Sequence, residues 1–127
     1  MRWPLLVVAI VVIVGACGHP VGVFTESDCP TTDPPTYANF GSGFFSTYCL
    51  DCHTTAKSGD ARNGAPATID FDTEALVRDE TSDIDKQAAW GPKAMNTIMP
   101  PDDHAPIPSG AERTRLGQFI ACEVANP

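Results

Sequence analysis

The chain has 127 residues, which is enough for one domain at most. It carries 8 basic and 16 acidic side chains, so its formal net charge at pH 7 is −8. A surface this acidic repels a phosphate backbone, which argues against a nucleic-acid partner. It is compatible with protein partners that present a basic docking patch.

The first residues have the layout of a secretory signal peptide. A short basic start, Met1-Arg2, precedes an unbroken apolar run over 5–14, which is too short for a comfortable membrane span. Small residues then lead to Cys17. Residues 14–17 resemble the lipobox of bacterial lipoproteins, in which cleavage occurs before a lipidated cysteine. An ordinary cleaved signal with an incidental cysteine is the alternative.

Three segments are expected in chain order. Residues 1–16 are predicted to be the lipoprotein signal peptide, and 17–36 a proline-rich tether from lipidated Cys17. Residues 37–127 are predicted to form the folded domain. The resemblance implies a lipid-anchored protein of the bacterial cell envelope that faces the periplasm. Gly18, in place of the aspartate that commonly retains lipoproteins at the inner membrane, favours the outer membrane.

The folded domain is predicted to be all-α, with about three to five short helices, because helical spacing recurs and strand-like alternation does not. Aromatic residues at helical spacing predict a helix over 38–52. A short helix is expected from Asp72-Thr73 through Val77. Another is expected after Ser82, with a break near Gly91-Pro92.

The last helix carries the clearest local signals. Ser109 and Glu112 have capping-box spacing, which predicts the start of the helix. Leu116, Phe119 and Ile120 follow as an apolar stripe. The helix is expected to end near residue 123.

Residues 49–53 form a C-x-x-C-H motif, with Cys49, Cys52 and His53 as its functional side chains. Two thiols three residues apart can both reach the vinyl groups of a haem. The adjacent histidine then lies under the iron as an axial ligand. In an exported protein this motif indicates one covalently attached haem c.

Three other chemistries could use the same residues. A thioredoxin-like redox pair would need a βαβ context and a helix start, and neither is predicted here. A zinc site could combine the motif with one further ligand from Cys29, Cys122 or His104. A structural disulfide between Cys49 and Cys52 is the third alternative.

The expected roles account for all five cysteines. If Cys17 takes lipid and the two cysteines of the motif take haem, Cys29 and Cys122 remain. An oxidising compartment favours a disulfide between them. Free buried thiols are the alternative.

Over residues 37–124 the chain resembles the class I c-type cytochromes. That family has a glycine, then an aromatic four residues later, then the first haem cysteine, and Gly41 and Phe45 occupy these positions before Cys49. Leu116 and Phe119 match an aliphatic and aromatic pair that crosses the glycine. The stretch after the motif, with Ala65-Pro66 and residues 71–73, resembles that of bacterial lipoprotein cytochromes of this family.

The resemblance implies a distal methionine on a proline-bearing loop. Met99, within Ile98-Met99-Pro100-Pro101, fits this pattern and is the expected sixth ligand. His104 on the same loop would instead give a bis-histidine haem. Met95 is a further candidate, although core packing is its expected role.

Supporting roles follow from the same resemblance. The carbonyl of Pro66, 13 residues after His53, is expected to accept the other N–H of that histidine. Arg62, Asn63 and Trp90 are candidate donors to the haem propionates. An ordinary surface or packing role is the alternative for each of them.

The expected function is electron transfer with transient redox partners, without enzymatic activity, because a haem with two protein ligands has no open site. A haem-based sensor or assembly module would require Met99 to be labile. An exported zinc or disulfide module without haem is the other alternative.

Overall fold

A computed structural model describes residues 21–126, so the predicted signal peptide and Cys17 lie outside the described residues. Within residues 21–126 the elements are helical, and the only bridge is an isolated antiparallel one between Trp90 and Met95. In the same part of the chain, no helix is long and apolar enough to cross a membrane. The elements are η1 (Tyr37–Gly41), α1 (Ser42–Tyr48), η2 (Gly59–Arg62), α2 (Glu74–Asp79), α3 (Thr81–Ala88) and α4 (Gly110–Ala125).

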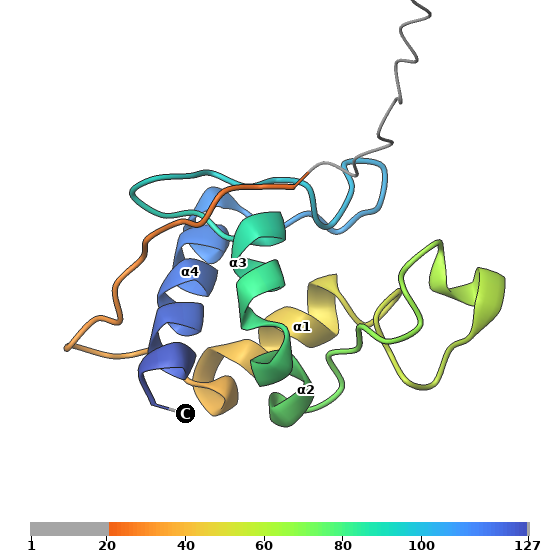
Figure 1. Cartoon of the computed structure of the whole chain (residues 1–127), viewed down its shortest axis with the longest axis horizontal. Coiled ribbons are helices and arrows are strands. Elements are labelled where there is room, and N and C mark those ends of the chain that lie inside the picture. The colour runs from red at the N-terminus through yellow and green to blue at the C-terminus, as the bar shows by residue number, and fades with distance from the viewer. Residues whose placement is uncertain (1–20, 127) are drawn as a thin grey trace, which may run out of the picture.

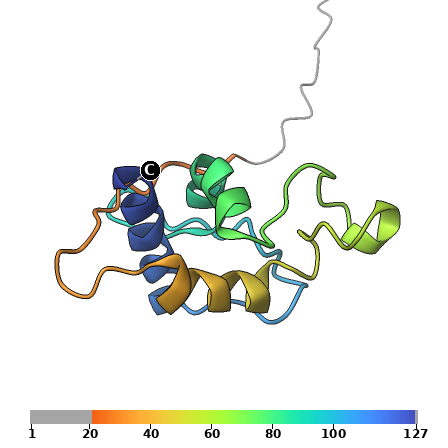
Figure 2. The same cartoon turned by 90° about the horizontal axis from the view of Figure 1, so that it is seen from below.

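The helices pack around one apolar core, which confirms the predicted all-α class. Helices α3 and α4 lie side by side, and α1 crosses them (Figure 1). The loop between α1 and α2 projects away from this body (Figures 1 and 2). The core combines the first helix, α2, α3 and α4 through Phe44, Phe45, Val77, Ile84, Leu116, Phe119 and Ile120.

Elements η1 and α1 form one continuous helix, called the first helix. It begins with a π-helical turn and ends earlier than expected. Thr36 starts it with a capping box, in which the Thr36 hydroxyl accepts from the Asn39 N–H. The helix ends at Tyr48, because the N–H groups of residues 49 and 50 both bond to the Phe45 carbonyl. The chain then turns away, and the C-x-x-C-H motif lies in this turn.

The first helix crosses α4 closely at Gly41, as the family resemblance implied. A methyl group on Gly41 would lie 3.0 Å from the Cζ atom of Phe119 and 3.0 Å from the Cδ2 atom of Tyr37. A side chain here would therefore push the two helices apart. By contrast, a methyl group on Gly43 would meet nothing within 4 Å.

The other predicted helices are present with shifted ends. Thr73 caps α2, and α3 stops at Ala88, before the predicted break. Helix α4 has the predicted capping box from Ser109 and runs two residues past the expected end. Met95 does not pack in the core: its side chain is 71% exposed, so the expected core role was wrong.

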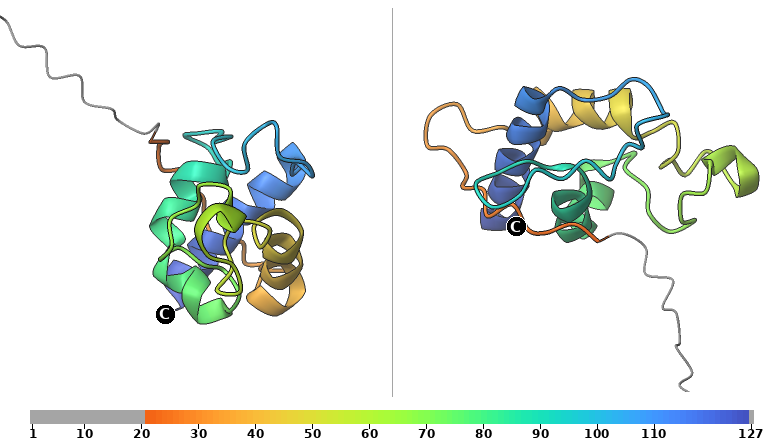
Figure 3. Two further views of the ribbon diagram at one scale, coloured as in Figure 1. Left: turned by 90° about the vertical axis from the view of Figure 1, so that its right-hand side faces the viewer. Right: turned by 90° about the horizontal axis from the view of Figure 1, so that it is seen from above.

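The predicted tether over 17–36 needs correction for the part that the structure describes. The segment runs past α3 and α4 before it enters η1 (Figures 1 and 3). Thr25 is buried, and its N–H and hydroxyl donate to the Asp85 carboxylate at 2.8 and 2.6 Å. The Asn96 side chain exchanges two hydrogen bonds with the Val23 backbone. Residues 21–36 therefore form a strap bonded to the domain.

A disulfide joins the strap to the last helix, as the cysteine arithmetic predicted. Cys29 pairs with Cys122, with Cα atoms 4.6 Å apart and a sequence separation of 93. Closing a loop of this length contributes about 4–5 kcal/mol in the chain-entropy model. The strap is thus fixed covalently as well as by hydrogen bonds.

The helix crossing predicts opposite effects for two neighbouring glycines. Gly43→Ala should raise the free energy of unfolding by up to about 1 kcal/mol, because alanine is the better helix former. The free energy of unfolding of Gly41→Ala should be about 1–3 kcal/mol lower than that of Gly43→Ala, because the new methyl group contacts Phe119. Urea unfolding of both variants measures the difference. Equal stabilities would contradict the close crossing.

Candidate functional site

The two cysteines of the motif are both unpaired within the described residues. Cys49 caps the end of α1, and Cys52 follows in the turn closed by hydrogen bonds to the Cys49 carbonyl. Both side chains are partly buried and neither forms a disulfide. Because Cys29 and Cys122 are joined to each other, they are not zinc ligands for this turn. A structural disulfide within the motif is likewise not formed.

The thiol of Cys49 has the wrong chemistry for a redox-active pair. Burial raises its pKa to about 12, and only the nearby charge of Arg113 opposes that effect. Reactive cysteines of thioredoxin-like sites have a lowered pKa instead. The environment of Cys49 therefore does not favour the thioredoxin-like alternative.

His53 is held in one orientation. Its Nδ1 atom lies 2.9 Å from the carbonyl oxygen of Ile69, and its ring packs on Phe71 with 4.9 Å between centroids. Because a carbonyl can only accept, Nδ1 carries the proton and Nε2 keeps its lone pair. Burial lowers the pKa of His53, which favours the neutral ring that binds metals.

The acceptor for His53 is Ile69, and the expected acceptor Pro66 was wrong. The loop reverses through η2 and through Asn63 and Gly64, which both have positive φ angles. This reversal turns the Pro66 carbonyl towards Arg62, whose Nη2 atom donates to it at 2.7 Å. The backbone carbonyl that reaches His53 comes three residues later, at Ile69.

Arg62 is a structural residue of this loop. It is 2% exposed and forms an ion pair with Asp70 at 2.8 Å. Its Nη2 atom also donates to the Ile69 carbonyl at 2.9 Å, which is the acceptor for His53. The predicted role as a propionate donor does not fit, since all three of its nitrogens donate within the loop. The other acceptors are the carbonyls of Thr54, Lys57, Ala65 and Pro66.

His104 lies beside the motif, on the side of Cys52. Its Nε2 atom is 2.8 Å from the Asp51 carboxylate and 3.7 Å from the Cys52 sulfur. The three ligand atoms all lie within 4.8 Å of one another. Asn63 also reaches this sulfur, with its Nδ2 atom at 3.5 Å. Asp51 was not singled out from the sequence, because its spacing from His104 carries no local signal.

Met99 lies on a loop that α4 holds in place. Its side chain is 38% exposed, and its N–H donates to the Gln87 carbonyl at 2.9 Å. Its carbonyl accepts from the Nη1 atom of Arg113 at 2.8 Å. Arg113, which sequence reasoning missed, therefore neighbours both Met99 and Cys49. A charged residue in the first turn of a helix is usually exposed, so no local pattern identified it.

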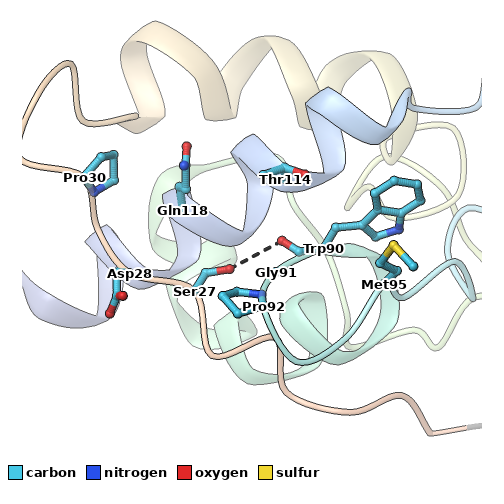
Figure 4. A pocket seen from close by; sticks show the side chains of 9 residues that line it. All are labelled: Ser27, Asp28, Pro30, Trp90, Gly91, Pro92, Met95, Thr114 and Gln118. Atoms are coloured by element: carbon cyan, nitrogen blue, oxygen red, sulfur yellow. Dashed lines mark hydrogen bonds between the residues drawn. The ribbon is translucent and has the colours of Figure 1, made fainter.

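Trp90 has an unpaired polar atom. Its indole Nε1 is buried and has no hydrogen-bond partner among the residues that the structure describes. Its ring covers Gly110, and its side chain lies beside that of Met95 in a surface pocket of about 520 Å³ (Figure 4). A buried donor without a partner is rare in folded proteins. Trp90 therefore remains a candidate donor to a bound group.

Comparison with family models, with curated proteins and with solved structures found no match to this chain.

The Arg62 network predicts a large loss of stability when it is broken. Arg62→Met should lower the free energy of unfolding by about 3–5 kcal/mol, because Asp70 would stay buried without its partner. Lys57→Met is the matched control, since Lys57 pairs with exposed Asp51 in the same loop. The control should cost under about 1 kcal/mol. Denaturant unfolding measures both, and similar losses would contradict the network's importance.

Proposed function

We propose that this protein is a c-type cytochrome that carries one covalent haem and transfers electrons. The observation that carries the proposal is the arrangement of His53 beside two unpaired thiols. The ring donates to Ile69 through Nδ1, and this leaves Nε2 free to bind iron. Neither a zinc site nor a redox-active or structural cysteine pair requires both thiols and an oriented histidine in this order.

The chain's own residues would divide the work of holding the group. Cys49 and Cys52 would form the two thioether bonds, which prevent loss of the cofactor from an exported protein. His53 would be the proximal ligand, fixed by the Ile69 carbonyl and by the Phe71 ring. When bound, a haem supplies reversible one-electron exchange at its iron.

Met99 is the proposed distal ligand. Its loop is fixed on α4 through Arg113, which also neighbours Cys49. His104 is less suited, because its Nε2 atom already bonds to Asp51. A thioether ligand favours ferrous iron and so raises the reduction potential relative to histidine. Trp90 is the proposed propionate donor, since its indole N–H has no partner in the described structure.

Partner and location follow from charge and from the N-terminal sequence. The formal charge of −8 favours a transient redox partner with a basic docking patch. We place the protein in the bacterial cell envelope, anchored by lipid on Cys17 and facing the periplasm. The bonded strap would hold the domain close to that anchor, because its hydrogen bonds to the domain begin at Val23, six positions after Cys17.

A zinc site is the second candidate, and one observation favours it. Asp51, Cys52 and His104 bring three ligand atoms within 4.8 Å of one another. Carboxylate, thiolate and imidazole are all zinc ligands. This cluster would not use His53, and Asp51 is exposed to water. Metal analysis after expression without the haem-attachment machinery distinguishes zinc from haem.

The proposed function predicts haem that survives denaturation. Protein expressed with the haem-attachment machinery should give a c-type pyridine haemochrome spectrum, with one haem per chain. Cys49→Ala should give a spectrum typical of one thioether bond, and Cys49→Ala/Cys52→Ala should retain no haem after acid–acetone extraction. A colourless wild-type protein that binds stoichiometric zinc would overturn the proposal in favour of the second candidate.

The distal assignment predicts different outcomes for two methionines. Met99→Ala should abolish the near-infrared band of methionine-ligated ferric haem and open the ferrous protein to carbon monoxide. Met95→Ala is the matched control and should keep both properties of the wild type. Persistence of the band in Met99→Ala would show that another residue is the ligand. Carbon monoxide binding by the wild type would instead favour a sensor.

A further inference from the structure

We propose that Arg113 is the positioning residue for the distal ligand, and that it places a buried positive charge next to the haem site. The inference deepens the proposed function and rests on it. Arg113 lies in the first turn of α4 and is 2% exposed. Its Nη1 atom donates to the carbonyls of Ala88, Asn96 and Met99 at 2.8, 3.2 and 2.8 Å.

These three carbonyls define what Arg113 holds. Ala88 is the last residue of α3, whereas Asn96 and Met99 bound the segment that carries the proposed ligand. The N–H groups of Asn96 and Met99 bond in turn to carbonyls at the end of α3. The segment is thus tied to α3 by its donors and to Arg113 by its acceptors.

The bond to Met99 matters most, because it is made at the ligand residue itself. Pro100 and Pro101 follow, and neither has an N–H group that could anchor the chain. Without Arg113, the backbone after residue 99 would have no hydrogen bond to α4 near this point. Arginine is suited to this role, since its Nη1 atom reaches one bond further than the nitrogen of a lysine and shares its two hydrogens among the three carbonyls.

Arg113 interacts with the charge of Asp102 only at a distance. Within residues 21–126 it forms no ion pair, unlike buried Arg62, which is paired with Asp70. A buried charge without a paired counter-ion costs free energy, and hydrogen bonds to backbone carbonyls offset part of that cost. Its bond to the carbonyl of Met99, the proposed ligand, places the charge next to the haem site and gives it a second effect. A nearby positive charge disfavours ferric iron relative to ferrous iron, so it raises the reduction potential.

Two substitutions separate the two effects. Arg113→Lys keeps the charge, but its nitrogen ends one bond short of the position of Nη1, whereas Arg113→Met loses both the charge and the donor. Arg115→Met is the matched control, because Arg115 lies on the same helix and pairs with exposed Asp33. Imidazole titration of the ferric protein reports how firmly Met99 is held. A redox titration measures the effect of the charge on the reduction potential. Hydrogen exchange at the Met99 amide measures how firmly the loop is held.

Both Arg113 variants should bind imidazole at least about tenfold more tightly than the wild type, which corresponds to about 1.4 kcal/mol. The Met99 amide should exchange faster in both. The reduction potential should fall in Arg113→Met and change much less in Arg113→Lys. Arg115→Met should match the wild type in all three measurements.

Unchanged imidazole affinity and amide exchange in both Arg113 variants would overturn the positioning role. A reduction potential that is unchanged in Arg113→Met would overturn the electrostatic role. Should Arg113→Met fail to fold, as judged by circular dichroism, the lysine variant still decides the positioning role. Failure of the proposed function is a separate outcome, because the wild type would then show no haemochrome spectrum.

Discussion

Backbone carbonyls in the loops must find donors, and this constraint governs the structure. Helices cover only short stretches, so the segments over 54–73 and 89–109 satisfy few of their own polar groups. Two buried guanidinium groups satisfy many of them. Arg62 bonds the loop after α1 to itself, and Arg113 bonds the loop after α3 to α4. The two sides of the candidate site therefore depend on two arginines.

The strap extends the same principle to the N-terminal segment. Residues 21–36 have no regular secondary structure before η1, yet Thr25 and Asp85 bond them to α3. The disulfide then fixes the strap to α4. A domain with so small a core gains from covalent and polar links between its surface segments.

In the proposed cytochrome, the two loops have matching tasks. The Arg62 loop presents the Ile69 carbonyl to His53, and the Arg113 loop presents Met99. The arginines hold both loops through backbone carbonyls, so the side chain of Met99 stays available for the cofactor. An electron carrier benefits from such rigidity, because small changes in geometry between its two redox states permit fast transfer.

Local patterns in the sequence were sufficient for features that local physics decides. The start and apolar stripe of α4 and the helical class could be read from residue spacing, and counting cysteines predicted the pair Cys29 and Cys122. Tertiary structure alone decided that Ile69 rather than Pro66 accepts from His53, that Arg62 is consumed by its own loop, and that Arg113 is buried. The reason is physical: these contacts depend on where irregular segments return in space, and no periodic pattern encodes that path.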